Sequence, residues 1–231
     1  MGALIIGGIF MLIGWIVSSR LKRKFREYSR TQLSMNLTGA EIARLMLTDN
    51  GILNVKVTCV PGQLTDHYNP ATKTVNLSEG VYNGRNAAAA AVASHECGHA
   101  VQHATAYSML QLRSAMVPIQ GISARVINIV FMMMIFGAFA VESFISWQTA
   151  LLIIIGCYAV FTLFALITLP VEFDASRRAL AWVQDRSIVT PKEHGMAKDA
   201  LWWASMTYVV AAIGALTTLF YYVMIFLGNR D

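Results

Sequence analysis

Four long apolar stretches divide the chain, and each is uncharged or nearly so. Helices suit them, because a rise of about 1.5 Å per residue lets roughly 17–25 residues cross a hydrocarbon core about 30 Å thick. The stretches are residues 3–17, 117–141, 149–169 and 202–227. The first just crosses a thin bilayer, and the third stops at Pro170. We therefore expect a mainly α-helical membrane protein with transmembrane helices over residues 1–19, 115–141, 149–171 and 201–228.

Nearly all the basic side chains lie in the two polar segments between these spans, residues 20–114 and 172–200. Basic residues follow the first span closely and recur between the third and fourth spans: Arg20, Lys22, Arg23, Lys24, Arg26 and Arg30, then Arg177, Arg178, Arg186, Lys192 and Lys198. Cytoplasmic loops of membrane proteins are enriched in Lys and Arg. We therefore expect a multi-pass protein of the cell membrane with its N-terminus outside and both polar segments facing the cytoplasm.

The composition supports this interpretation and excludes others. Of 231 residues, 56% are hydrophobic and 13% are charged, whereas charged residues make up roughly a quarter of an ordinary soluble domain. The net charge of +5 follows from the topology, and no basic face interleaved with stacking aromatics predicts a nucleic-acid partner. Three scattered cysteines are too few for a disulfide framework or a cysteine zinc site. The lipid bilayer is the expected partner.

The larger polar segment has the pattern of a small α+β unit. Residues 38–47 predict a short helix, with Thr38 as its N-cap and Glu41 completing a capping box. Residues 55–60 and 72–77 are strand candidates, separated by a turn-rich stretch. An alanine-rich run then predicts a helix over residues 86–106.

A metal-binding motif, His95-Glu96-Cys97-Gly98-His99, lies within that alanine-rich helix. Histidines at i and i+4 share one helix face, so both imidazoles can reach one Zn²⁺ ion. Glu96 then stands beside the metal, where it can take a proton from a bound water. Gly98 costs about 1 kcal/mol relative to alanine inside a helix, which suggests a packing need.

A catalytic zinc site needs a third protein ligand, for which the sequence offers two candidates. His103 lies two turns beyond His95, and three histidines so spaced cannot all reach one ion from a straight helix. Glu172 is favoured because it follows the third span on the side assigned to His95. An acidic residue at a span end needs a partner, and Arg177 or Arg178 is the alternative to a metal.

The order and spacing of several motifs resemble the YugP-like membrane zinc metallopeptidases over most of the chain. The matching segments are Thr65-Asp66-His67-Tyr68-Asn69-Pro70, Leu77-Ser78 through Val81-Tyr82-Asn83, SHECGHAVQH, Leu112-Arg113-Ser114-Ala115 and PVEFDASRRAL. The resemblance implies a zincin-like unit and a zinc-dependent endopeptidase that acts on a peptide or membrane-protein substrate. It implies His95, His99 and Glu172 as ligands and Glu96 as the general base.

One position departs from a related pattern. The chain is also similar to HtpX-like and prenyl-protein proteases, whose glutamate ligand lies in a Glu-x-x-Ala-Asp pattern. Here the last position is Ser176, and Asp174 is the candidate substitute for the missing aspartate.

The sequence leaves open several details of catalysis and two rival functions. Residues 72–77 are expected to form an edge strand that aligns an extended substrate. Candidates for the oxyanion partner are Tyr68, His67, Tyr107, His194 and Arg178. One rival is a site-2-type intramembrane protease, although the apolar run before the motif, residues 87–93, is short. The other is a non-catalytic zinc-binding membrane scaffold, which would not need Glu96.

Overall fold

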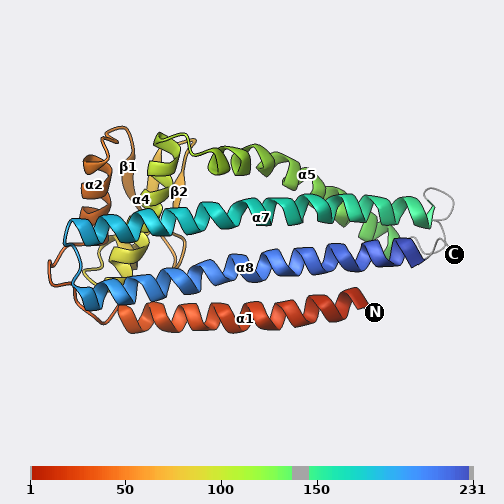
Figure 1. Cartoon of the computed structure of the whole chain (residues 1–231), viewed down its shortest axis with the longest axis horizontal. Helices are drawn as coiled ribbons and strands as arrows, with labels where there is room; N and C mark the ends of the chain where they lie inside the picture. The colour runs from red at the N-terminus through yellow and green to blue at the C-terminus, as the bar shows by residue number, and fades with distance from the viewer. Residues whose placement is uncertain (1, 137–145, 229–231) are drawn as a thin grey trace. The chain divides into compact units, whose positions relative to one another are not determined.

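The computed structural model describes residues 2–136 and 146–228, and its contacts divide the chain into two compact units. Unit 1 comprises Met1–Trp15, Leu112–Leu169 and Tyr208–Asp231. Unit 2 comprises Ile16–Gln111 and Pro170–Thr207. Four long helices contribute to both units: α1 (Gly2–Tyr28), α5 (Ser108–Phe136), α7 (Trp147–Asp185) and α8 (Pro191–Gly228) (Figure 1).

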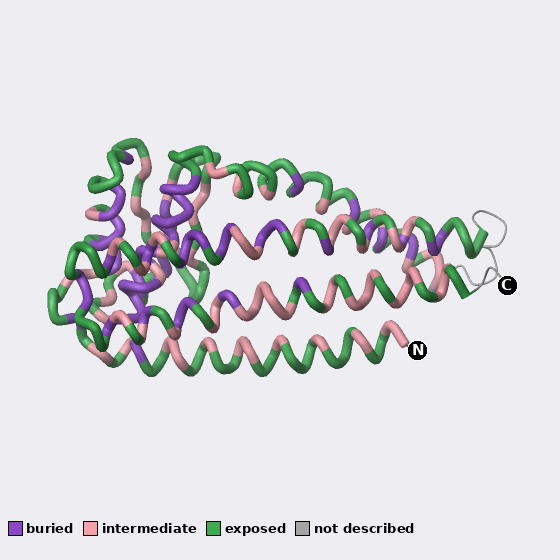
Figure 2. The backbone as a smooth tube through the Cα atoms, viewed as in Figure 1, coloured by how far each residue is buried: buried purple, intermediate pink, exposed green. Residues whose placement is uncertain are grey.

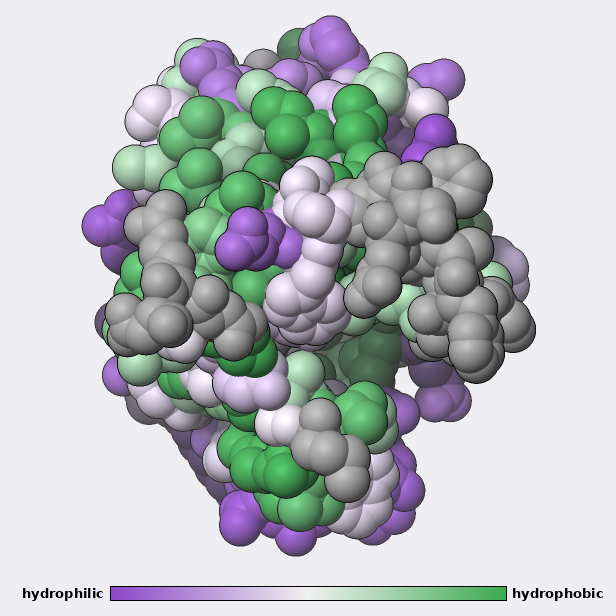
Figure 3. All heavy atoms as spheres, turned by 90° about the vertical axis from the view of Figure 1, so that its right-hand side faces the viewer, coloured by the Kyte–Doolittle hydropathy of each residue, from purple (hydrophilic) through white to green (hydrophobic). Residues whose placement is uncertain are grey.

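Unit 1 consists of the apolar parts of these four helices. Within the described residues, these are the helices long and apolar enough to cross a membrane, and their number agrees with the four predicted spans. Ile127 and Val130 of α5 pack against Ala150, Ile154 and Cys157 of α7. Many large apolar residues of the unit stay exposed, among them Leu4, Leu152 and Leu163. Figure 2 shows exposed positions along these helices, and Figure 3 shows apolar residues at the surface of one face. Such a surface suits lipid as the solvent. The expected end of the second span, residues 137–141, lies outside the described residues.

The helix that contains the third apolar stretch continues beyond the proline at which that stretch stops. α7 is continuous through that proline and runs on to Asp185. Proline removes one backbone donor, but Val171, Ala175, Ala179 and Val183 are fully buried after it, so packing holds the helix together. At 39 residues α7 is about 58 Å long, roughly twice the thickness of a hydrocarbon core.

Helix α4 (Ala87–Ala104) lies at the centre of unit 2 and is buried on every side, as the purple tube of Figure 2 shows. Its alanines join different clusters: Ala93 packs toward the sheet and α2 (Gly39–Asp49), Ala90 beside Val183, and Ala91 beside Ala179. Methyl side chains let neighbours approach closely all round. A helix that is apolar on all faces is a core helix.

Helix α2 begins as its sequence predicts. The Thr38 hydroxyl accepts a hydrogen bond from the Glu41 amide, and the Glu41 carboxylate accepts one from the Thr38 amide. At the other end, Asp49 accepts hydrogen bonds from the Trp182 indole and from the Nε and Nη2 atoms of Arg186. This clamp ties the end of α2 to the end of α7.

The sheet has three strands in the order β1-β3-β2, comprising β1 (Lys56–Val60), β2 (His67–Asn69) and β3 (Thr74–Ser78). β3 pairs in parallel with β1 and antiparallel with β2, and it leads into the short helix α3 (Glu79–Tyr82). The expectation of an edge strand over residues 72–77 is therefore wrong, because β3 is central. The sequence did not reveal β2, which is only three residues long and lies within the turn-rich stretch.

Candidate metal centre

Three potential ligands from two helices converge inside unit 2. His95 and His99 project from α4, and Glu172 projects from α7. The Glu172 Oε2 atom lies 3.4 Å from His95 Nε2 and 3.6 Å from His99 Nε2. One ligand atom from each residue lies within 4.8 Å of the other two. Two imidazoles and one carboxylate form the donor set of a catalytic zinc site, so these residues fit the ion that the motif predicts.

The two helices meet at Gly98, one residue before the second histidine. A Cβ atom at this position would lie 2.5 Å from the backbone oxygen of Ala175. Only glycine allows this approach, and Ala175 itself is fully buried. The packing need expected of Gly98 is thus confirmed. The contact brings α7 close enough to α4 for Glu172 to reach the histidines.

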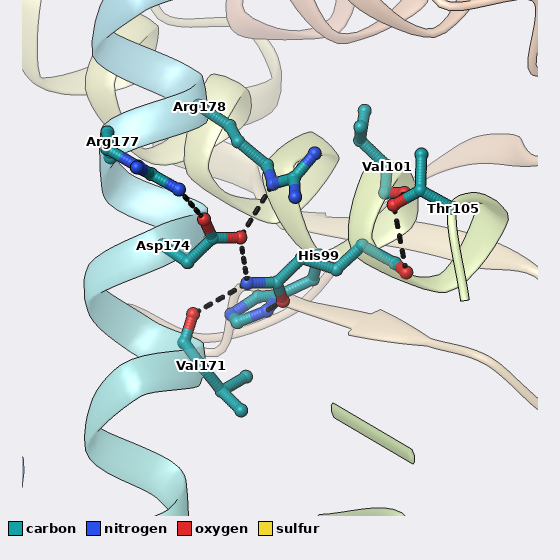
Figure 4. Close-up of polar contacts among 8 residues, drawn as sticks. His99, Val101, Thr105, Val171, Asp174, Arg177 and Arg178 are labelled. Carbon is teal, nitrogen blue, oxygen red and sulfur yellow. Dashed lines mark hydrogen bonds and ion pairs between the residues drawn. The ribbon is translucent and has the colours of Figure 1, made fainter. Parts of the chain in front are cut away.

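A buried amide fixes the orientation of His99. The side-chain nitrogen of Gln102 donates hydrogen bonds to the Val171 carbonyl at 2.8 Å and to Asp174 at 3.0 Å. Its oxygen therefore faces His99 Nδ1, 3.0 Å away, and accepts a hydrogen bond from it. His99 consequently carries its hydrogen on Nδ1 and presents the Nε2 lone pair toward Glu172. Figure 4 shows Asp174 at the junction of this network, also bound by Arg177 and Arg178.

His95 is supported by a different group. Its Nδ1 atom lies 3.1 Å from the hydroxyl of Ser176, one helical turn after Glu172. The serine that replaces aspartate in the related pattern therefore contacts a candidate ligand directly. Asp174 acts one step further away, through Gln102. The motif alone does not place Gln102 in the site, although its spacing of i+3 from His99 is a usable signal.

Glu96 lies beside these residues and is buried, with 8% of its surface exposed. Burial raises the pKa of its carboxyl group, the Glu172 and Asp66 carboxylates add to that rise, and the two imidazoles oppose it. A carboxyl group with a raised pKa can accept and return a proton near neutral pH.

The other candidates named from the sequence, for the third ligand and for the oxyanion partner, make contacts outside the group of three ligands. His103 Nδ1 is hydrogen-bonded to the Tyr68 hydroxyl at 2.7 Å, and His103 is not part of the ligand group found in the described residues. His67 Nδ1 faces the Thr65 carbonyl. The Arg178 guanidinium binds Asp174 and lies over the ring of Tyr107. His194 lines a groove between α7 and α8.

The comparisons with known proteins identify the family of the chain. The chain matches the family described as "putative neutral zinc metallopeptidase" over residues 3–227. It is 41% identical over 213 residues to the "Putative membrane protease YugP" of Bacillus subtilis (strain 168), covering 92% of this chain and 91% of that protein. No solved structure matches the chain. These matches confirm the resemblance noted in the sequence, and the chain belongs to this family of neutral zinc metallopeptidases.

Proposed function

We propose that the protein is an integral-membrane zinc endopeptidase that hydrolyses peptide bonds, with His95, His99 and Glu172 as zinc ligands and Glu96 as general base. The observation that carries the proposal is the convergence of three ligand atoms from α4 and α7 beside a buried carboxyl group. The assignment to the zinc peptidases follows from the family to which the chain belongs.

In this mechanism each residue of the site has a separate role. His95, His99 and Glu172 hold the ion, while Ser176 and Gln102 keep the imidazoles oriented. When bound, zinc lowers the pKa of its water to about 7 and polarises the scissile carbonyl. Glu96 takes the proton of the attacking water and returns it to the leaving amine nitrogen, so its pKa must allow both transfers.

We assign substrate alignment to the outer strand β2 in place of β3. β2 has one unpaired edge, and its Tyr68 reaches His103 on the motif helix. Asp66, immediately before β2, is near enough to Glu96 to raise its pKa. An extended substrate that paired with β2 would therefore run beside the catalytic carboxyl group.

We further propose that the site faces the cytoplasm. The support is the placement of Lys and Arg, which are rare in the apolar stretches and dense after the first and third spans. A cysteine introduced at Lys73 should be protected from an impermeant reagent added outside intact cells. Labelling from outside would reverse the topology and change the pool of substrates.

Two rival functions fit the chain less well. A site-2-type intramembrane protease would carry its motif in a transmembrane helix, and α4 is not among the candidate spans of the described residues. A zinc-binding scaffold would not need the buried Glu96.

The decisive experiment compares Glu96→Gln with wild type in zinc content and peptide hydrolysis. The variant keeps the shape but loses the base, so zinc should stay stoichiometric while hydrolysis falls by at least about 100-fold. Glu79→Gln, an exposed carboxyl group on α3, is the matched control and should change neither quantity. Near wild-type hydrolysis by Glu96→Gln would refute the mechanism.

A further inference from the structure

A cavity of about 330 Å³ lies in unit 2 between the end of α7 and the beginning of α8, whose ribbons run side by side (Figure 1). We call it the α7–α8 groove. The two helices pack through Ala179 of α7 and Ala197 and Leu201 of α8. Residues spaced three or four apart line each wall, as expected for two helix faces: Phe173, Arg177, Leu180 and Gln184 on α7, and His194, Lys198 and Trp202 on α8.

The lining changes in polarity along the groove. At one end the rings of Phe173 and Trp202 lie 6.4 Å apart, and both side chains are exposed. The next contact joins Ala179 to Ala197, an earlier residue of α8, so the two helices are antiparallel. Arg177 and Lys198 therefore line the groove about one turn, or 5 Å, beyond the aromatic pair. The aromatic end adjoins the apolar stretches of both helices. The groove has the order that is found at a membrane surface, where aromatic rings lie at headgroup level and basic groups lie further out.

The groove also carries a surplus of positive charge. The single Asp174 carboxylate is shared by Arg177 and Arg178, and in the part of the chain that the structure describes no carboxylate pairs with Lys198. Other acidic groups on α8 are bound elsewhere, with Asp199 at Tyr28 and Lys24 and Glu193 at Ser34. An anion in the groove would therefore meet two exposed cations: Arg177, which shares the single Asp174 carboxylate with Arg178, and Lys198, which has no carboxylate partner among the described residues.

We propose that the α7–α8 groove binds the headgroup of an anionic membrane phospholipid. Arg177 and Lys198 bind the phosphate, while Phe173, Leu180 and Trp202 contact the apolar part of the lipid next to it. The inference does not depend on proteolysis. It does connect to the metal centre, because Ser176 lines the groove and its hydroxyl contacts His95.

The test is native mass spectrometry of the full chain in detergent, titrated with phosphatidylglycerol or with phosphatidylcholine of the same acyl chains. Wild type should bind phosphatidylglycerol at least about tenfold more tightly, because basic pockets of this kind select acidic headgroups. The double variant Arg177→Gln/Lys198→Gln should lose that preference. Arg30→Gln/Lys56→Gln removes two exposed charges outside the groove and should bind as wild type does.

A second variant separates a defined site from general charge attraction. Ala181 is exposed and lines the groove, so Ala181→Trp should fill it without changing the charge and should also weaken phosphatidylglycerol binding about tenfold. Unchanged binding by Ala181→Trp, or equal binding of both lipids by wild type, would overturn the proposal. Complete displacement of the lipid by millimolar inorganic phosphate would do so too, since it would identify a site for free phosphate.

Discussion

The two parts of α7 on either side of Pro170 follow the same helical period but obey different constraints. Before the proline the helix is apolar, and Leu152, Leu163 and Leu166 are about half exposed. After it, the helix buries Glu172, Asp174 and Ser176 together with small residues such as Ala175. Outside its contact with α5, the first part needs mainly length and apolarity, because lipid accepts any apolar surface. The second part tolerates fewer changes, because each buried polar group requires a hydrogen-bond or ion-pair partner.

The strongest test of this contrast is loss of the ligand carboxylate. Glu172→Ala should reduce zinc affinity by more than about 100-fold and abolish hydrolysis, since a ligand contributes more than the outer groups that are worth 10–100-fold. His103→Ala should keep stoichiometric zinc, because the His103 imidazole is hydrogen-bonded to the Tyr68 hydroxyl and is not part of the ligand group. Zinc content by elemental analysis decides between the two residues. Loss of zinc only in the His103 variant would remove Glu172 from the site.

Two helix glycines should respond in opposite ways to alanine. Gly98→Ala places a methyl group against the backbone of Ala175 and should cost about 1–3 kcal/mol of stability, the usual cost of overpacking. Gly156→Ala, in the first part of α7, meets nothing within 4 Å and should be neutral or stabilising by up to about 1 kcal/mol. Thermal unfolding of the two variants measures the difference. Equal destabilisation would mean that both parts are equally constrained.

The orienting amide gives a smaller effect confined to the second part. Gln102→Met keeps the volume but removes the hydrogen bonds to His99, Val171 and Asp174, so zinc affinity should fall about tenfold. Cobalt substitution offers a second readout, because the visible spectrum reports ligand geometry. Gln148→Met, an exposed position in the first part, is the control. Wild-type affinity and spectrum in Gln102→Met would show that the amide does not orient the ligand.

The smallest effect concerns the clamp beyond the end of α7. The Arg186 guanidinium lowers the pKa of Asp49 below its usual value. A lowered folded pKa means that this contribution to stability is present above about pH 4 and disappears as the pH falls through the folded pKa. Asp49→Asn should therefore destabilise slightly at pH 7 and lose less stability than wild type on acidification. Urea unfolding at pH 7 and pH 3 tests it, and parallel pH curves would contradict it.

The pattern of residues predicts those parts of the fold that local rules control. The four long apolar helices, the Thr38 cap and the alanine-rich helix each depend on residues close in sequence, and each is present in the structure, although the long helices extend beyond the expected apolar spans. The central position of β3 and the continuity of α7 through Pro170 depend on distant packing partners. No local signal encodes such partners.

The candidate site divides in the same way. Spacing alone places His95, Glu96 and His99 on one helix, and the position of Glu172 after the third span, together with the family resemblance, adds the third ligand. The hydrogen bonds of Gln102 and Ser176 could not be predicted, because they require the register between α4 and α7 that the contact at Gly98 sets.

The burial of α4 on every side also has a kinetic consequence. A core helix exchanges its amide hydrogens mainly when the whole unit opens, whereas edges and loops exchange by local fluctuations. The amides around His95 and His99 should therefore exchange among the slowest in unit 2, and those of the outer strand β2 among the fastest. Hydrogen–deuterium exchange resolved along the chain measures this order directly.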